Sequence, residues 1–354
     1  MTMGKEENIT HLYRLPAEWE EHEATWIGWP HNKTDWPGKF SAIQWVYAEI
    51  VKFISRCEKV RIIVYSKEDE RTAVYVLNSV MTDLSNIEFY VKKTNRGWLR
   101  DSAPAFVKSD KDLIAVDFKF NAWAKYNDYK LDDEVPAFIS KKFKMKKNIA
   151  EHKSKKVVLE GGGIDINGKG SLITTEECLM DDKLQVRNPG FTKSDYEEIF
   201  NKYLGITNVI WLGKGITGDD THGHVDDLCR FVNEDTVVVV QENNSNDENF
   251  KVLKGNRERL ECVNLENGFK LRMVELPMPS PVIFKGQRLP ASYANFYISN
   301  YSVLVPTFND PKDRIALGIL SEIFPEREVI GIHSVDLVWG LGTIHCLTHE
   351  QPAV

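Results

Sequence analysis

The stretch Val338-Trp339-Gly340-Leu341-Gly342-Thr343-Ile344-His345-Cys346 is an apolar run that two glycines interrupt and that ends at a cysteine. Three other short segments have the same character, because each sets a carboxylate or an imidazole in otherwise apolar surroundings. They are Trp98-Leu99-Arg100-Asp101, Leu159-Glu160-Gly161-Gly162-Gly163 and Gly223-His224-Val225-Asp226. Together the four segments supply a nucleophile, a base and three acids.

These segments recur at intervals that indicate a loose internal repeat. Its centres fall near Trp98, Glu160, His224, Asn295 and Trp339, so successive gaps are about 62, 64, 71 and 44 residues. Each gap holds strands and one helix. A ring of such modules would send one equivalent loop per module to a common centre, where residues distant in sequence would meet.

Runs rich in β-branched residues predict strands along the whole chain. They cover residues 60–65, 87–91, 113–118, 156–159, 171–174, 208–211, 236–241, 301–306 and 329–332. Apolar residues spaced by three and four predict helices between them. These cover residues 40–56, 67–84, 193–203, 247–261 and 310–323. The pattern predicts an α/β fold with a mixed sheet.

Domain organisation follows from the lack of any linker rich in Pro, Gly or Ser. We expect one catalytic domain over residues 11–354, preceded by a flexible tail over residues 1–10.

Composition narrows the class of protein. No apolar stretch approaches the roughly 18 residues that would span a bilayer, and the first residues lack the apolar core of a signal peptide. Five cysteines without a Cys-x-x-Cys pair argue against a disulfide framework and a zinc knuckle, so we expect a soluble, cytoplasmic protein. A net charge of -7 disfavours nucleic acid as a partner and suits a small cationic substrate.

The segment around His224 has two interpretations. In an extended chain His222, His224 and Asp226 would share one face, because alternate side chains of a strand point the same way. These three residues could bind a metal ion in a hydrolase, since imidazole and carboxylate are zinc ligands. Alternatively, His224 is a general acid/base, Asp226 holds the substrate and His222 has a supporting role.

Candidate residues in the other segments follow from their settings. Cys346 could act as a nucleophile, and His345 is excluded as its base because neighbours in a strand face opposite sides. Glu160 precedes three glycines, which indicates close approach of a ligand or another chain segment. Trp98 and Trp123 could flank the aliphatic or cationic part of a ligand.

Asp101 also has a plain structural interpretation, as a partner in a surface salt bridge or as a helix cap beside Arg100. Its place in one of the recurring segments makes it a candidate for binding substrate instead.

The chain resembles the agmatine deiminases and the bacterial peptidylarginine-deiminase-like family of the guanidine-modifying superfamily. The resemblance is carried by ordered motifs over nearly the whole chain. They are Leu15-Pro16-Ala17-Glu18-Trp19, His22-Glu23-Ala24-Thr25-Trp26, Trp98-Leu99-Arg100-Asp101, Leu159-Glu160-Gly161-Gly162, Thr175-Glu176-Glu177-Cys178-Leu179, Gly223-His224-Val225-Asp226 and Gly342-Thr343-Ile344-His345-Cys346. It implies a five-bladed α/β propeller with pseudo-fivefold symmetry, and hydrolysis of a guanidinium group to a ureido group and ammonia without a metal or other cofactor.

By motif position the resemblance implies that Cys346 is the nucleophile and His224 the acid/base. It implies that Asp101 and Asp226 clamp the guanidinium and that Glu160 is a further active-site acid. The expected substrate is agmatine, giving N-carbamoylputrescine, and the relatives suggest a homodimer. The alternatives are deimination of free or peptidyl arginine, a metal-dependent hydrolase, and a propeller that only binds its partners.

Overall fold

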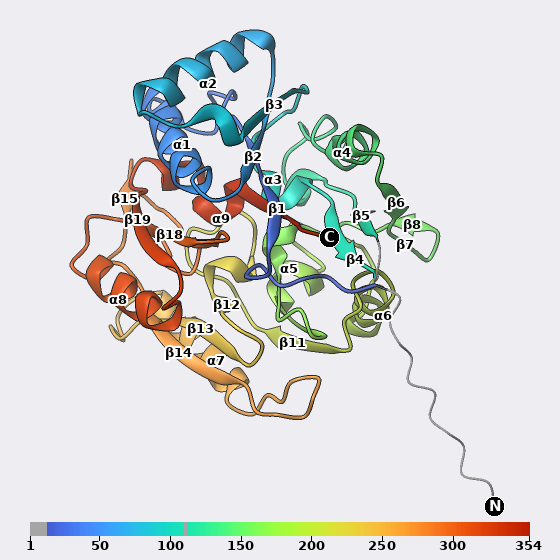
Figure 1. Cartoon of the computed structure of the whole chain (residues 1–354). Coiled ribbons are helices and arrows are strands. Elements are labelled where there is room, and N and C mark those ends of the chain that lie inside the picture. Colours follow the sequence, from blue (N-terminus) through green and yellow to red (C-terminus); the bar gives the residue numbers. More distant parts are fainter. Residues whose placement is uncertain (1–12, 110–111) are drawn as a thin grey trace, which may run out of the picture.

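The computed structural model describes residues 13–109 and 112–354. The expected tail over residues 1–10 lies outside these residues. Five sheets within the described part repeat one unit: an antiparallel strand pairs with a central strand, which then pairs in parallel with a strand reached through a helix. Figure 1 shows the longer helices around the outside of the molecule and the short helices α3 and α9 towards its middle.

Four of the sheets contain three strands each. They are β4 (Ala105–Lys108), β5 (Leu113–Asp117) and β6 (Lys146–Ile149); β9 (Ile164–Ile166), β10 (Ser171–Thr175) and β11 (Asn208–Leu212); β12 (Cys229–Phe231), β13 (Thr236–Gln241) and β14 (Arg272–Pro277); and β17 (Tyr297–Ile298), β18 (Ser302–Thr307) and β19 (Glu328–His333). Their connecting helices are α4 (Val135–Phe143), α6 (Lys193–Leu204), α7 (Asn249–Leu260) and α8 (Asp313–Ile323).

The remaining large sheet has four strands. Its order is β20 (Thr348–Pro352), β1 (His22–Gly28), β2 (Lys59–Val64) and β3 (Ile87–Val91), with helices α1 (Phe40–Ile54) and α2 (Lys67–Ser79) as crossovers. Because β20 pairs antiparallel with β1, strands from the two ends of the described chain share one sheet. The hairpins β7 (Glu151–His152) with β8 (Lys155–Lys156) and β15 (Ile283–Phe284) with β16 (Gln287–Arg288) are separate.

Buried central strands and amphipathic helices explain why the sheets lie inside the molecule and the longer helices lie around them. In β13 the first five residues, Thr-Val-Val-Val-Val, are all buried, as expected for a strand that is covered on both faces. Each buried valine contributes roughly 1.5–3 kcal/mol relative to an exposed one. Helix α6 begins at a capping box between Thr192 and Asp195 and ends at Gly205, whose φ of 73° suits glycine.

The sequence predicted many of the longer elements with small differences in their bounds, but it missed the strands β1, β14 and β20. The helix expected over residues 67–84 stops at Ser79, and the strand expected over 156–159 is only the end of the β7–β8 hairpin. Helix α4 was not predicted. It begins with a proline in its first turn and has a lysine-rich exposed face, so its apolar periodicity is short.

Two segments treated as extended are not. Residues 337–347 form the 3-10 turn η5 (Leu337–Gly340) and the short helix α9 (Ile344–Leu347), with Leu341 at a φ of 67° between them. His222 and Gly223 both have positive φ, and the chain then enters the turn η4 (Val225–Asp227). The turns are favoured because they direct polar side chains inward between strands.

The segments that carry the candidate residues occupy equivalent places in the fold. Each lies just before the first antiparallel strand of a sheet: α3 (Leu99–Ser102) before β4, η3 (Gly161–Gly163) before β9, η4 before β12, Asn295 before β17, and α9 before β20. Helix α3 contacts α9 and η3, and η3 contacts η4. Among the described residues, no helix is both long and apolar enough to cross a membrane.

Candidate active site

Cys346 lies buried in α9 with its thiol against an amide and a carboxylate. The Nδ2 of Asn295 donates to its Sγ at 3.3 Å, and the Oδ2 of Asp226 is 3.7 Å from the same sulfur. Burial, together with the negative charges of Asp226, Asp227 and Asp101, raises the pKa of Cys346 well above its usual value, while the Asn295 hydrogen bond opposes that rise. The resting thiol is therefore protonated, and a cation in this space would favour the thiolate.

Asp226 is oriented by His345. The Nδ1 of His345 lies 2.7 Å from Asp226 Oδ2, and its Nε2 lies 2.8 Å from Glu18 Oε2. Burial opposes the charge of Asp226, but the hydrogen bond and charge of His345 outweigh it and lower the pKa of Asp226. The Oδ1 of Asp226 has no hydrogen-bond partner among the described residues, so it remains available to a ligand.

The assumption that His345 points away from the site is therefore wrong. It rested on strand geometry, whereas successive side chains of a helix such as α9 are only about 100° apart. His345 and Cys346 consequently reach the same Asp226 oxygen, one by hydrogen bond and one at 3.7 Å.

His224 projects into the centre from the turn before β12. Asp219 accepts hydrogen bonds from the backbone N–H groups of Gly223 and His224, at 2.6 and 3.2 Å, which fixes the chain that carries the ring. Burial would lower the pKa of His224, but the charge of Asp101 offsets it and the pKa lies well above its usual value. The imidazole is thus ready to donate a proton.

Asp101 faces His224 from α3. Its Oδ1 accepts from Gly162 N at 2.9 Å, and its Oδ2 accepts from Trp123 Nε1 at 2.8 Å. The Nδ1 of His224 lies 3.9 Å from Asp101 Oδ1. Burial raises the pKa of Asp101 against the opposing effect of His224.

Gly162 shows how closely these groups converge. A Cβ at this position would lie 2.6 Å from His224 Nδ1 and 3.0 Å from both Asp101 Oδ1 and Asp226 Oδ2. Three polar atoms thus surround one point where only glycine fits. Gly342 has a similar role beside the thiol, because its Cβ would meet Cys346 Sγ at 3.1 Å.

Glu160 lies on the far side of the imidazole. Its Oε1 accepts from Arg187 Nε at 3.2 Å, and its Oε2 lies 3.9 Å from His224 Nε2. Burial opposes its ionisation, but Arg187 and His224 prevail and lower the pKa of Glu160 to about 2. Glu160 is therefore a permanent negative charge beside the ring.

A pocket leads from the surface to Cys346 and Asp101. It has a volume of about 520 Å³, including its open mouth, and both predicted tryptophans, Trp98 and Trp123, line it. Asp35, Arg96 and Asp220 lie along its wall. Asp35 is buried, which raises its pKa to about 6 despite the opposing guanidinium of Arg96.

His222 does not take part in this convergence. Its Nε2 lies 2.5 Å from Asp181 Oδ2, and the residue is absent from the lining of the pocket. The alternative set of metal ligands, His222 with His224 and Asp226, is not among the groups of neighbouring ligand atoms within the described residues. The positive φ of His222 and Gly223 turns the His222 side chain out of the alternating pattern.

Sequence reasoning missed the roles of several contacts. Asn295 was noted as the centre of a repeat but was given no role, although it touches both Cys346 and Asp227. Burial, together with the negative charge of Asp226, raises the pKa of Asp227 well above its usual value. Glu18 acts through His345, and Arg187 acts through Glu160. Glu18 lies in one of the motifs that carry the family resemblance, but that motif does not reveal its distant partner.

Proteins of known identity have similar sequences and structures. The agmatine deiminase of Pseudomonas aeruginosa strain LESB58 is 34% identical over 365 aligned positions, covering 96% of each chain. That of Medicago truncatula is 35% identical, covering 97% of each. A solved structure of the agmatine deiminase of Enterococcus faecalis superposes with a TM-score of 0.88 at 28% identity, covering 96% of each chain.

The sequence profile of one family extends across almost the whole protein. It matches residues 14–352, a span that includes every segment of the pocket and its buried centre. The chain therefore belongs to the Porphyromonas-type peptidyl-arginine deiminase family.

Proposed function

We propose that this protein hydrolyses agmatine to N-carbamoylputrescine and ammonia through a covalent intermediate on Cys346. The observation that carries the proposal is the buried meeting of a thiol, an imidazole and carboxylates at the end of an acidic pocket. The relatives named as agmatine deiminases support the choice of reaction and of substrate.

The guanidinium group would be held by Asp101 and Asp226. A carboxylate matches the planar N–H edge of a guanidinium, and charge-assisted pairs of this kind fix orientation. The free Oδ1 of Asp226 offers one such acceptor. Trp98 and Trp123 would bracket the aliphatic part of the substrate, because both line the pocket next to Asp101.

The bound cation would also activate the nucleophile. Carboxylates disfavour the thiolate of Cys346, and a guanidinium placed between them reverses that effect. The Sγ proton passes to solvent through the open pocket, and the sulfur attacks the guanidinium carbon.

His224 would then serve both halves of the reaction. When the C–N bond breaks, the imidazolium gives its proton to the departing nitrogen, which leaves as ammonia, and an S-alkylthiouronium remains on Cys346. The neutral imidazole next removes a proton from water, which adds to the same carbon. As the C–S bond breaks, the remaining hydroxyl proton of this intermediate passes to the sulfur, so the thiol is restored and the ureido product leaves. Glu160 stabilises the protonated ring throughout.

The charges of the pocket favour agmatine over arginine. Asp35, Asp101 and Asp220 line it, and Arg96 is the single basic side chain among the residues that line it. Arg96 is bonded to Asp35, and its NH2 group lies 3.3 Å from Asp128, so its charge is already compensated. The distal ammonium of agmatine would be attracted here, whereas the carboxylate of arginine would be repelled.

The five-bladed α/β propeller with pseudo-fivefold symmetry belongs to the same proposal. It is supported by the five sheets of common topology and by the equivalent position of the site segment before each. A cytoplasmic location remains an expectation, in keeping with five unpaired cysteines. The homodimer and the lack of nucleic-acid binding also remain expectations.

The direct test is ammonia release from agmatine, free arginine and an arginyl peptide in parallel, with Cys346→Ser as the control. We expect turnover of agmatine, at least 100-fold weaker turnover of the other two, and none in the variant. Faster turnover of arginine would overturn the substrate assignment. Loss of activity on adding a chelator would favour a metal-dependent hydrolase instead.

If none of the three compounds is turned over, the thiol can be tested by labelling. A propeller that only binds its partners would show equally slow labelling of its buried cysteines, with no effect of added agmatine. The proposal requires agmatine to accelerate labelling at Cys346.

A further inference from the structure

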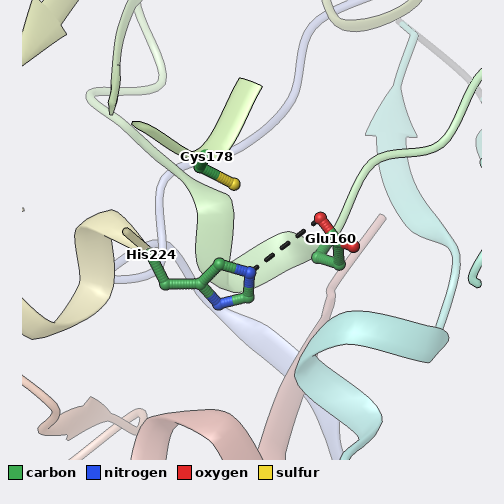
Figure 2. Close-up of side chains that lie close together, drawn as sticks. All are labelled: Glu160, Cys178 and His224. Atoms are coloured by element: carbon green, nitrogen blue, oxygen red, sulfur yellow. Dashed lines mark ion pairs between the residues drawn. The ribbon is translucent and has the colours of Figure 1, made fainter. Parts of the chain in front are cut away.

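A second cysteine lies behind the acid/base histidine, on the side away from Cys346's carboxylates. Figure 2 shows Cys178, Glu160 and His224 pointing toward one another, with the ion pair between Glu160 and the ring drawn as a dashed line. One donor atom from each of the three residues lies within 4.8 Å of the others, and all three residues are buried. They supply a sulfur, a nitrogen and an oxygen.

Several donor atoms of this cluster are unpaired. Among the described residues, neither ring nitrogen of His224 has a hydrogen-bond partner, and neither has Glu160 Oε2. The His224 and Glu160 side chains are only 1% and 0% exposed. Buried polar atoms of native proteins are nearly always satisfied, and each exception requires an explanation. The Nδ1 of His224 faces Asp101, whereas His224 Nε2 and Glu160 Oε2 face Cys178 without a hydrogen bond, and this open pair of atoms indicates a ligand there.

The surrounding chain holds Cys178 in place and leaves room beside it. Cys178 lies in the short helix α5 (Glu176–Met180), where its N–H donates to Thr175 Oγ1 at 3.0 Å. Opposite it stands Gly163, where a Cβ would lie 3.4 Å from Cys178 Sγ and 3.9 Å from His224 Nε2. Glycine at this position keeps the space between sulfur and imidazole open.

We propose that Glu160, Cys178 and His224 form an inhibitory site for a single zinc ion. Thiolate, imidazole and carboxylate are the ligands of tetrahedral zinc, with water as the fourth. Zinc–ligand bonds of about 2.0–2.3 Å place tetrahedral donors roughly 3.4 Å apart. The Nε2 of His224 and the Oε2 of Glu160 are 3.9 Å apart, and all three donor atoms lie within 4.8 Å of one another. Each pair of donor atoms would therefore need to approach by roughly 0.5 to 1.4 Å. The thiolate disfavours magnesium and calcium, which prefer oxygen.

Zinc in this site would stop the reaction by occupying His224. A metal-bound ring nitrogen cannot carry a proton, so neither ammonia release nor water attack could be assisted. This consequence depends on the proposed deiminase function, whereas binding itself does not. Arg187 keeps Glu160 Oε1 engaged, which leaves Oε2 as the oxygen that faces the ion.

The test uses cobalt(II) as a coloured probe for zinc and compares three variants. We expect thiolate-to-cobalt charge-transfer absorption in the unmodified protein, in Cys346→Ser and in Cys229→Ser, but not in Cys178→Ser. Cys229 is a matched control because it is also buried but lies outside the cluster. Added zinc should abolish the absorption. Absorption that survives in Cys178→Ser, or that is lost in Cys346→Ser, would overturn the proposal.

Two further measurements cover the remaining outcomes. If Cys178→Ser does not fold, X-ray absorption at the zinc edge of Cys346→Ser replaces it, and one sulfur at about 2.3 Å is expected. A spectrum without sulfur contradicts the site. In activity assays, Cys178→Ser should require at least 10-fold more zinc for half-inhibition, relative to its own metal-free rate. If no deiminase activity exists, the cobalt spectra still decide the binding site.

Discussion

Gly162→Ala is expected to disable the site while leaving the fold intact. The φ of Gly162 lies outside the left-handed region, so alanine brings no backbone strain and acts only through its methyl group. That methyl would stand 2.6 Å from His224 Nδ1 and 3.0 Å from the nearest oxygens of Asp101 and Asp226.

The size of the effect follows from the displacement. To reach an ordinary contact of about 3.5 Å, the imidazole must move by about 0.9 Å and each carboxylate by about 0.5 Å. Misplacement of reacting groups by about 1 Å costs about 100-fold in rate, which corresponds to about 2.7 kcal/mol of transition-state stabilisation. The overpacking itself should cost about 1–3 kcal/mol of stability.

The assay is steady-state ammonia release from agmatine, with thermal unfolding measured on the same samples. Gly255→Ala is the matched control, because Gly255 lies in α7 with nothing within 4 Å of an added Cβ. It should keep full activity and gain about 0.5–1 kcal/mol of stability from helix propensity. If Gly162→Ala keeps more than a third of the kcat/KM of the unmodified protein, the convergence of the three groups is not required for catalysis.

Three further predictions concern single contacts. Asn295→Ala removes the hydrogen-bond donor to Cys346 Sγ, so the pKa of that thiol should rise further. The pH profile for alkylation of Cys346 should then move to higher pH. An unchanged profile would exclude a role of Asn295 in stabilising the thiolate. The pKa of Asp35 is about 6, so its negative charge is lost as the pH falls through 6. The KM for agmatine should therefore rise below pH 6 in the unmodified protein. In Asp35→Asn the KM should not change over the same pH range. Glu160→Gln removes a charge that favours the protonated form of His224. The limb of the pH profile of kcat/KM that reports His224 should therefore move to lower pH. A shift to higher pH would refute the role of Glu160 as the charge that stabilises protonated His224.

Some of the strands were predictable because their signal is local, although β1 (His22–Gly28) and β14 (Arg272–Pro277) were missed. Residues 87–91 and 236–241 were expected as strands and form β3 and β13 with those bounds, since β-branched and aromatic residues favour buried strands wherever turns flank them. The α/β class followed from the alternation with helices. The pairing of β20 with β1 was not predictable, because it joins residues that lie more than 300 apart.

The site was predictable only in part. Cys346, His224, Asp226, Asp101 and Glu160 were expected to meet, and they do lie around a common centre. His345 and Cys346 were treated as neighbours in a strand, whereas they lie in the short helix α9, which places His345 on Asp226. Tertiary contacts, which no sequence pattern encodes, decide the partners Asn295, Glu18 and Arg187.

The central claim is that the thiol of Cys346 becomes bonded to the guanidinium carbon during turnover. Acid quenching during turnover of agmatine, followed by mass spectrometry of the peptide that contains Cys346, measures this directly. The account predicts an adduct with the mass of agmatine less ammonia on Cys346, absent from Cys346→Ser and from protein without substrate. Full activity in Cys346→Ser, or an adduct on a different cysteine, would contradict it.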